Sequence, residues 1–196
     1  MNHEFWYLSR AAGFTAYLLL FASMALGMMI TSRVGSGGKR QNLVFDMHRF
    51  VSVLALLVTA FHAYILLGDQ YLNFNVWQLS VPFLSPYRGM AVAVGVVSAY
   101  ALALVVASFW MRQRIGFRAW RMIHFFSFVL YAGATAHGIA AGTDTSTLWA
   151  GAMYFGTCLI LLALLVYRID YAMRQRDETL RREAVKTAKK TRRLAA

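Results

Sequence analysis

The chain has 196 residues, of which 59% are hydrophobic and 14% are charged, and its formal net charge is +12. The apolar residues come in blocks of about twenty, which is typical of a membrane protein with several spans and excludes an ordinary water-soluble domain. These blocks lack the alternation of period two that a β-barrel strand requires, so the spans are predicted to be helices. Cys158 is the only cysteine, which excludes an internal disulfide.

Five blocks are long enough to cross a hydrocarbon core of about 30 Å at about 1.5 Å per residue. They cover residues 11–30, 45–67, 89–111, 119–141 and 147–168. The first block follows MNHEFWYLSR and is not closed by a small-residue cleavage site, so it is interpreted as a retained helix and not as a secretory signal. We predict an all-α membrane protein of five transmembrane helices, with residues 1–170 forming one domain and residues 171–196 a basic tail.

Basic residues are unequally shared among the segments that connect these blocks. The tail from Arg168 onward holds ten of the twenty Lys and Arg, whereas segment 68–88 has only Arg88 and segment 142–146 has none. The positive-inside rule therefore predicts an outside N-terminus and a cytoplasmic tail. The remaining cationic side chains that carry this prediction are Arg33, Lys39, Arg40, Arg112, Arg114 and Arg118.

Topology and attraction to anionic lipid account for most of the net charge, so no nucleic-acid partner is expected. The tail is interpreted as a solvated, partly helical extension, with a docked cytoplasmic partner as the alternative. The segment YLNFNVWQLSVPFLSPYRG is aromatic, nearly uncharged and interrupted by Pro82 and Pro86. We expect a short helix there across the outer mouth of the bundle, serving either as an interfacial anchor or as a lid.

Four of the five histidines lie inside predicted spans, where ionisable side chains are costly and usually face a partner or a cavity. They are His48 and His62 in the second span and His124 and His137 in the fourth. Both spans begin on the cytoplasmic side and so run parallel. His48 and His124 therefore share one depth near the inner face, and His62 and His137 share a second depth near the outer face, about 20 Å away.

This arrangement limits the chemistry of the four histidines. Ligands spread over about 20 Å cannot meet at one metal ion, and the nearest acid, Asp46, lies only at the inner boundary. Two facing imidazoles are the complete protein ligand set of a six-coordinate haem iron, so two stacked haems are predicted. A two-histidine metal site at each depth remains an alternative. For each histidine taken alone, the alternative is a buried side chain bonded across a helix interface.

The rotation of each pair around its helix gives an unequal result. Fourteen residues leave His62 about 40° from His48, on the same helix face, whereas thirteen residues leave His137 about 140° from His124. The second offset requires either an irregular helix near Gly133 or Gly138, or a different direction of approach to the outer pair.

The spacings His-x13-His and His-x12-His, two helices apart, resemble the ferric reductase-like transmembrane domain. This domain is the haem-bearing core of ferric reductases, NADPH oxidases and the haem-binding subunit of a bacterial methionine sulfoxide reductase. Nearly the whole chain up to about Asp170 is similar to its short bacterial members, in the segments LSRAAGFTAYLLL, FDMHRF, AFHAYILLGD, PFLSPYRGMAV, WRMIHFFSF and AHGIAAGTD. The resemblance implies two non-covalent, bis-histidine b haems, one held by His48 and His124 and the other by His62 and His137.

The resemblance also implies electron flow across a bacterial inner membrane. The chain departs from ferric reductases and NADPH oxidases because no nucleotide-binding fingerprint follows the last span. We therefore expect an electron-transfer subunit that takes electrons from a separate flavoprotein or from quinol and passes them to an outer acceptor. Ferric iron, oxygen and a flavin-carrying partner are candidate acceptors, and the oligomeric state stays open.

Haem propionates are anionic and call for cations near each surface. The candidates are Arg49 and Arg121 at the inner depth and Arg10 and Arg88 at the outer depth, whereas Arg118 is explained by topology. Two other classes of function stay open. A transporter with histidines that carry protons or metal ions would call for acidic partners and broken helices at mid-membrane. A structural membrane subunit would not need the four histidines.

Overall fold

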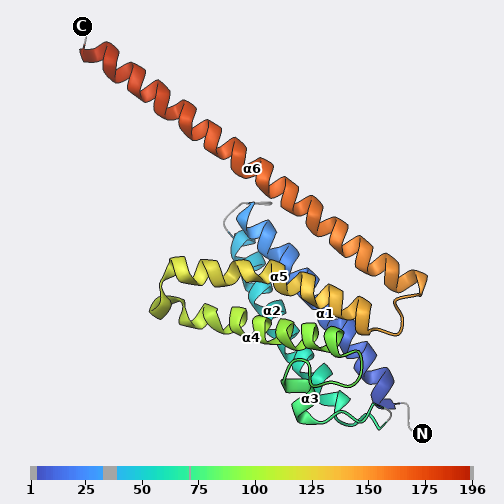
Figure 1. Ribbon diagram of the computed structural model, residues 1–196. Helices are drawn as coiled ribbons and strands as arrows, with labels where there is room; N and C mark the ends of the chain where they lie inside the picture. Colours follow the sequence, from blue (N-terminus) through green and yellow to red (C-terminus); the bar gives the residue numbers. More distant parts are fainter. Residues whose placement is uncertain (1–3, 33–38, 71, 195–196) are drawn as a thin grey trace.

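The computed structural model describes residues 4–32, 39–70 and 72–194, so His3 and Arg33 lie outside the described residues. These residues form six helices and no strand: α1 (Glu4–Thr31), α2 (Lys39–Leu66), α3 (Val76–Ser80), α4 (Gly89–Ile115), α5 (Phe117–Ala141) and α6 (Leu148–Leu194). Figure 1 shows α1, α2, α4 and α5 gathered in one bundle, with α6 running diagonally past it.

All of these helices except α3 are long and apolar enough to cross a membrane. The prediction of an all-α protein with five candidate spans is therefore confirmed, and the architecture is compatible with a multi-pass membrane protein. Large apolar side chains such as Leu57, Leu104 and Phe155 are exposed on the outside of the helices. Such exposure is expected where lipid, and not water, surrounds the protein.

The bundle is built from two helical hairpins, α1 with α2 and α4 with α5. A single residue, Gly116, connects α4 to α5, and its φ of 82° is readily adopted only by glycine. The predicted connection 112–118 was therefore too long. Arg112 and Arg114 lie in the last turn of α4, and Arg118 lies inside α5, because one glycine is enough to reverse the chain.

The core lies where α1 meets α4, α5 and α6. Its polar centre is Tyr17, whose hydroxyl group lies 2.8 Å from the Tyr131 hydroxyl and 2.7 Å from the Thr157 Oγ1. These contacts join three helices while satisfying buried polar groups. The surrounding buried side chains are apolar: Leu20, Met24, Met28, Leu102, Val105, Val106, Leu130, Ala150, Tyr154 and Leu161.

Helix α6 is 47 residues long and continues without a break through the predicted boundary between residues 170 and 171. Its first part packs on α1, and the rest extends away from the bundle, as Figure 1 shows in orange and red. Ion pairs one turn apart, Arg174 with Asp170 and Arg182 with Glu178, are of the kind that supports exposed helices. The tail is thus helical as far as Leu194.

The segment between α2 and α4 contains the expected short helix, α3. A capping box starts it: the Asn75 side chain accepts a hydrogen bond from the Gln78 backbone N–H, and the Gln78 side chain accepts one from the Asn75 backbone N–H. Two other residues of this segment, Asn73 and Phe83, have positive φ values of 47° and 71°. Trp77 is exposed, as an interfacial anchor would be.

Candidate functional site

His62 projects from α2 onto the N-terminal half of α1. Its Nδ1 donates a hydrogen bond of 2.9 Å to the backbone carbonyl of Ser9. One turn further along α1 lies Gly13, where a Cβ atom would stand 3.2 Å from the His62 Cε1. The glycine therefore leaves room for the imidazole, while the carbonyl fixes which nitrogen carries the proton.

His48 has the same surroundings fourteen residues away on both helices. Its Nδ1 donates to the Ser23 carbonyl at 2.9 Å, and a Cβ atom at Gly27 would stand 3.3 Å from its Cε1. The same supporting pair, a serine and a glycine four residues later, thus occurs twice in α1, in SRAAG (9–13) and SMALG (23–27). The prediction that the two histidines of the second span share a helix face is confirmed, because both rest on α1.

His137, near the end of α5, is held by α4. Its Nδ1 donates a hydrogen bond of 2.8 Å to the Ala91 carbonyl. A Cβ atom at Gly95, one turn further along α4, would stand only 2.5 Å from this Nδ1. The third histidine thus has the same two supports as the first two, a carbonyl and a glycine four residues later, from a different helix.

His124 differs from the other three histidines, because its ring makes no hydrogen bond within the described residues. It stacks on Trp120, one turn earlier in α5, with the ring centroids 5.3 Å apart and the planes at 25°. It also lies beside His48, with the ring centroids 6.1 Å apart and the planes at 80°. We call these two histidines and their surroundings the His48–His124 level.

Helix α5 is α-helical without interruption from Phe117 to Ala141, so no irregularity occurs near Gly133 or Gly138. Because its two histidines are about 140° apart around the helix, they contact different neighbouring helices. His124 points toward His48 of α2, whereas His137 is turned toward α4. Of the two explanations that the sequence left open, a different direction of approach is the one that the structure has.

His62 and His137 line one cavity of about 270 Å³. We call these two histidines and the cavity the His62–His137 level. The supporting residues Ser9, Gly13 and Gly95 line it as well. Apolar side chains make up most of the remaining wall, including some from the segment that carries α3: Phe14, Leu20, Leu72, Phe74, Leu79, Leu102, Leu130 and Tyr154. The cavity is therefore a largely apolar space with an imidazole from each helical hairpin.

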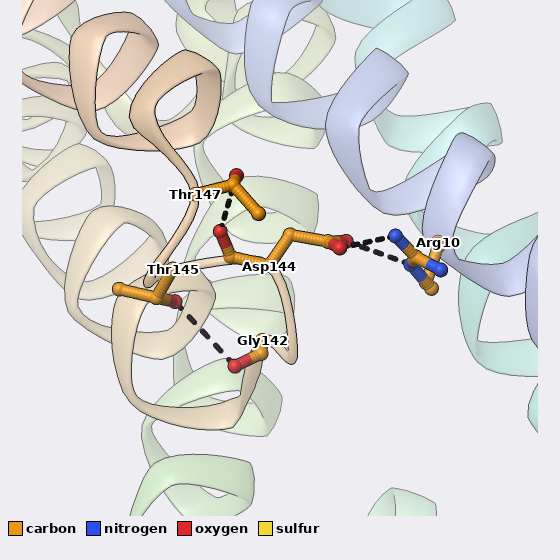
Figure 2. Close-up of polar contacts among 5 residues, drawn as sticks. All are labelled: Arg10, Gly142, Asp144, Thr145 and Thr147. Atoms are coloured by element: carbon orange, nitrogen blue, oxygen red, sulfur yellow. Dashed lines mark hydrogen bonds and ion pairs between the residues drawn. The ribbon is translucent and has the colours of Figure 1, made fainter.

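Arg10 is the only one of the four candidate arginines that lines this cavity. Figure 2 shows it reaching from α1 to Asp144 in the connection between α5 and α6. Its Nε donates to one carboxylate oxygen at 2.7 Å, and its terminal nitrogen donates to the other. The guanidinium also lies over the Trp6 ring, 4.1 Å from its centroid. This ion pair was not predicted from the sequence.

The other three arginines lie at the margins of the bundle. Arg88 donates to the Ala140 carbonyl at 2.6 Å and so ties the start of α4 to the end of α5. Arg49 is exposed and lies 3.9 Å from Asp46. Arg121 is exposed beside the ring of Phe125. Their assignment to haem propionates stays a prediction.

The described residues contain no group of three or more His, Cys, Asp or Glu side chains that could hold a metal ion. What each level does contain is two imidazoles from different helical hairpins. At three of these imidazoles the Nδ1 proton is committed to a carbonyl, which leaves Nε2 with a free lone pair. The arrangement can thus bind a group that accepts one nitrogen ligand from each side.

A protein family described as a domain of unknown function (DUF8596) matches residues 4–144. The match covers most of the chain, including His48, His62, His124 and His137, so the chain belongs to this family. No curated protein and no solved structure shows significant similarity to it.

Proposed function

We propose that this member of the DUF8596 family is a transmembrane cytochrome with two b-type haems, which carries single electrons across a membrane. The observation that carries this proposal is the way in which neighbouring helices hold three of the histidines. His48, His62 and His137 each donate Nδ1–H to a backbone carbonyl, and each faces a glycine on the helix whose carbonyl accepts that bond. Ligand histidines are held in this way in metal and haem sites, because the bond fixes the tautomer and raises the basicity of Nε2.

The surroundings of the two levels fit a bound haem. One metal ion bound by an imidazole from each side would separate the two ring centroids by about 6 Å, because each metal–nitrogen bond is about 2 Å long. The centroids of the His48 and His124 rings are 6.1 Å apart, so these two side chains would be spaced to hold such a group. At the other level, His62 and His137 line a largely apolar cavity, as a hydrophobic macrocycle requires.

A haem with two histidine ligands supplies a one-electron couple and offers no open position to a substrate. The chain's own part would be to hold the four imidazoles, to exclude water with apolar side chains, and to place cations near the carboxylates. Arg10 lines the cavity and is the best-placed candidate cation, although it is shared with Asp144. Burial and the hydrogen bonds behind each ligand are the means by which such a protein adjusts a reduction potential.

The resemblance to the ferric reductase-like transmembrane domain supports the same function and suggests its direction. We propose that a separate flavoprotein or membrane quinol donates the electrons and that an acceptor outside the bacterial inner membrane receives them. The basic tail and the basic end of the α4–α5 hairpin support a cytoplasmic location for that end of the bundle. A transporter is less well supported, since α1, α2, α4 and α5 are unbroken where a transporter would have interrupted helices.

An absorbance spectrum of the purified protein, oxidised and then reduced with dithionite, tests the proposal. We expect the sharp bands of a six-coordinate b-type haem and about two haems per chain by pyridine haemochrome assay. A preparation that stays colourless after expression with added haem precursor and after reconstitution with hemin would contradict the proposal. A ratio near one would contradict the second site.

A further inference from the structure

Trp120 lies one turn before His124 on α5, and the two side chains share a helix face. Their rings are stacked, and this stacking is the closest support that His124 has. The other three histidines are each held by a carbonyl and a glycine, which leave the ring little freedom. An aromatic ring in stacked contact restricts the plane of an imidazole in a different way, by covering one of its faces.

The indole Nε1 of Trp120 is buried and has no hydrogen-bond partner among the described residues. An indole nitrogen can only donate, so the missing partner must be an acceptor. A buried N–H group without an acceptor loses its hydrogen bonds to water without replacement, and such groups are rare in folded proteins. The unpaired donor therefore indicates an acceptor that binds beside His124.

The charges around this position are positive. Arg168 of α6 lies within electrostatic range of both His124 and Arg121. Neither Arg121 nor Arg168 forms an ion pair with an acidic side chain within the described residues. Two cations that approach each other without an acid are stabilised when an anion lies near both. An indole donor and two guanidinium groups are together complementary to a carboxylate.

We infer that the Trp120 indole N–H donates a hydrogen bond to a haem carboxylate at the His48–His124 level, and that Trp120 thereby positions both this haem and His124. Arg121 and Arg168 supply the compensating charge. This inference rests on the proposed function, because a haem carboxylate is present only if haem binds. It adds a residue that acts at one level alone, because the histidines at the other level are already held by carbonyls.

The variant Trp120→Phe tests the inference, because phenylalanine keeps a ring for stacking and removes the N–H group. The binding of hemin is measured in the His62→Ala chain, which retains only the His48–His124 pair, with and without Trp120→Phe. We expect Trp120→Phe to weaken hemin binding by about 10-fold, as for other groups that support a ligand from behind. Trp149→Phe is the matched control, since Trp149 packs in a tilted ring contact on Phe14 away from this level, and it should leave the affinity unchanged.

A second probe distinguishes a haem carboxylate from a lipid phosphate as the acceptor. Hemin dimethyl ester lacks the anionic carboxylates and keeps only the weaker ester acceptors, so the loss caused by Trp120→Phe should be smaller with this probe than with hemin. An equal loss with hemin and with its ester would overturn the inference, because the acceptor would then belong to lipid or the effect would be one of packing. Equal affinities for hemin with and without the substitution would overturn it as well.

Redox titration of the full-length chain, with all four histidines, provides a readout that does not depend on the His62→Ala variant. Trp120→Phe should keep two haems per chain and shift the midpoint potential of one component only. Unchanged potentials for both components would overturn the inference while leaving the proposed function intact. A parent chain that binds no haem at all would overturn the proposed function itself.

Discussion

The two levels contain the same pair of residues but support them differently. At the His62–His137 level, both imidazoles donate to carbonyls, both face glycines, and a cavity lies between them. At the His48–His124 level, only His48 has these supports, and the two rings already face each other. A histidine pair can therefore be prepared for a ligand either by the backbone of a neighbouring helix or by an aromatic side chain on its own helix.

The difference arises in the second hairpin. Helix α1 carries its Ser and Gly supports twice at a spacing of fourteen residues, which matches the spacing of His48 and His62. Helix α4 carries such a support once, at Ala91 and Gly95. The thirteen-residue spacing on α5 turns His124 away from the direction of His137, so a second copy on α4 would not meet it. Trp120, on the same helix as His124, supports this ring instead.

The largest expected effect is the loss of one haem on removal of one histidine. His62→Ala should remove the haem of the His62–His137 level, and His48→Ala that of the other level, because an iron with one imidazole left is weakly held. Pyridine haemochrome assays should give about one haem per chain for each variant, and redox titration should show a different remaining component. Loss of the same component in both variants would break the assignment of the two levels.

A glycine substitution tests the support at the His62–His137 level. A Cβ atom at Gly95 would stand 2.5 Å from the His137 Nδ1, so Gly95→Ala must displace a ring that is already bonded to Ala91. We expect loss of most of the haem at this level and destabilisation by about 1–3 kcal/mol, as for other overpacked sites. Haem content and thermal unfolding in detergent measure the two effects.

Gly151→Ala is the matched control, because nothing lies within 4 Å of a Cβ atom placed there. Alanine favours a helix over glycine, so this control should leave haem content unchanged and stability equal or slightly higher. Gly27→Ala, at 3.3 Å from the His48 Cε1, should have an effect between these two. An equal haem content in the Gly95→Ala variant and its control would show that the glycine is not needed to place His137.

The last comparison concerns the acidic partners of the arginines at the two levels, where we expect the smallest effect on haem content. Arg10 and Asp144 form a bidentate pair whose side chains are 28% and 14% exposed, whereas Arg49 and Asp46 are 46% and 69% exposed and 3.9 Å apart. Asp144→Asn should therefore destabilise the protein by about 1–3 kcal/mol, because charge-assisted bonds in a partly buried site are among the stronger ones. Asp46→Asn should have an effect near zero, as for most exposed pairs.

Thermal unfolding in detergent measures both changes, and the Arg10→Gln/Asp144→Asn double variant checks that the two residues interact. Its destabilisation should be smaller than the sum of the effects of Arg10→Gln alone and Asp144→Asn alone. Strictly additive effects would show that the contact between α1 and the α5–α6 connection contributes nothing through its charges. An equal loss of stability in Asp144→Asn and Asp46→Asn would contradict this difference between the two ion pairs.

Several parts of the fold and of the candidate site could be predicted because they depend on local properties of the chain. Uniformly apolar blocks identified the five long helices, and the fixed rise per residue placed His48 opposite His124 in height. The α4–α5 connection was predicted too long, because apolar composition ends before the helix does. Arginines in the last turn of α4 can remain helical, and Gly116 alone reverses the chain.

Contacts between distant segments could not be predicted in the same way. Arg10 and Asp144 are 134 positions apart, and no pattern in either segment indicates the other. The repeat of Ser and Gly in α1 was visible in the sequence, but its meaning depends on which helix packs against that face. The same holds for Trp120, whose buried N–H becomes informative only once its surroundings are known.

The sequence by itself determined that the protein has five long apolar helices and two heights at which histidines recur. Both results follow from a helix's constant rise and from the length of an apolar block, which are local quantities. The tertiary structure decided which way each imidazole points, which carbonyl or ring holds it, and that only one of the four candidate arginines reaches the cavity. These features depend on the rotation of each helix against its neighbours, which side-chain packing sets and residue counting does not contain.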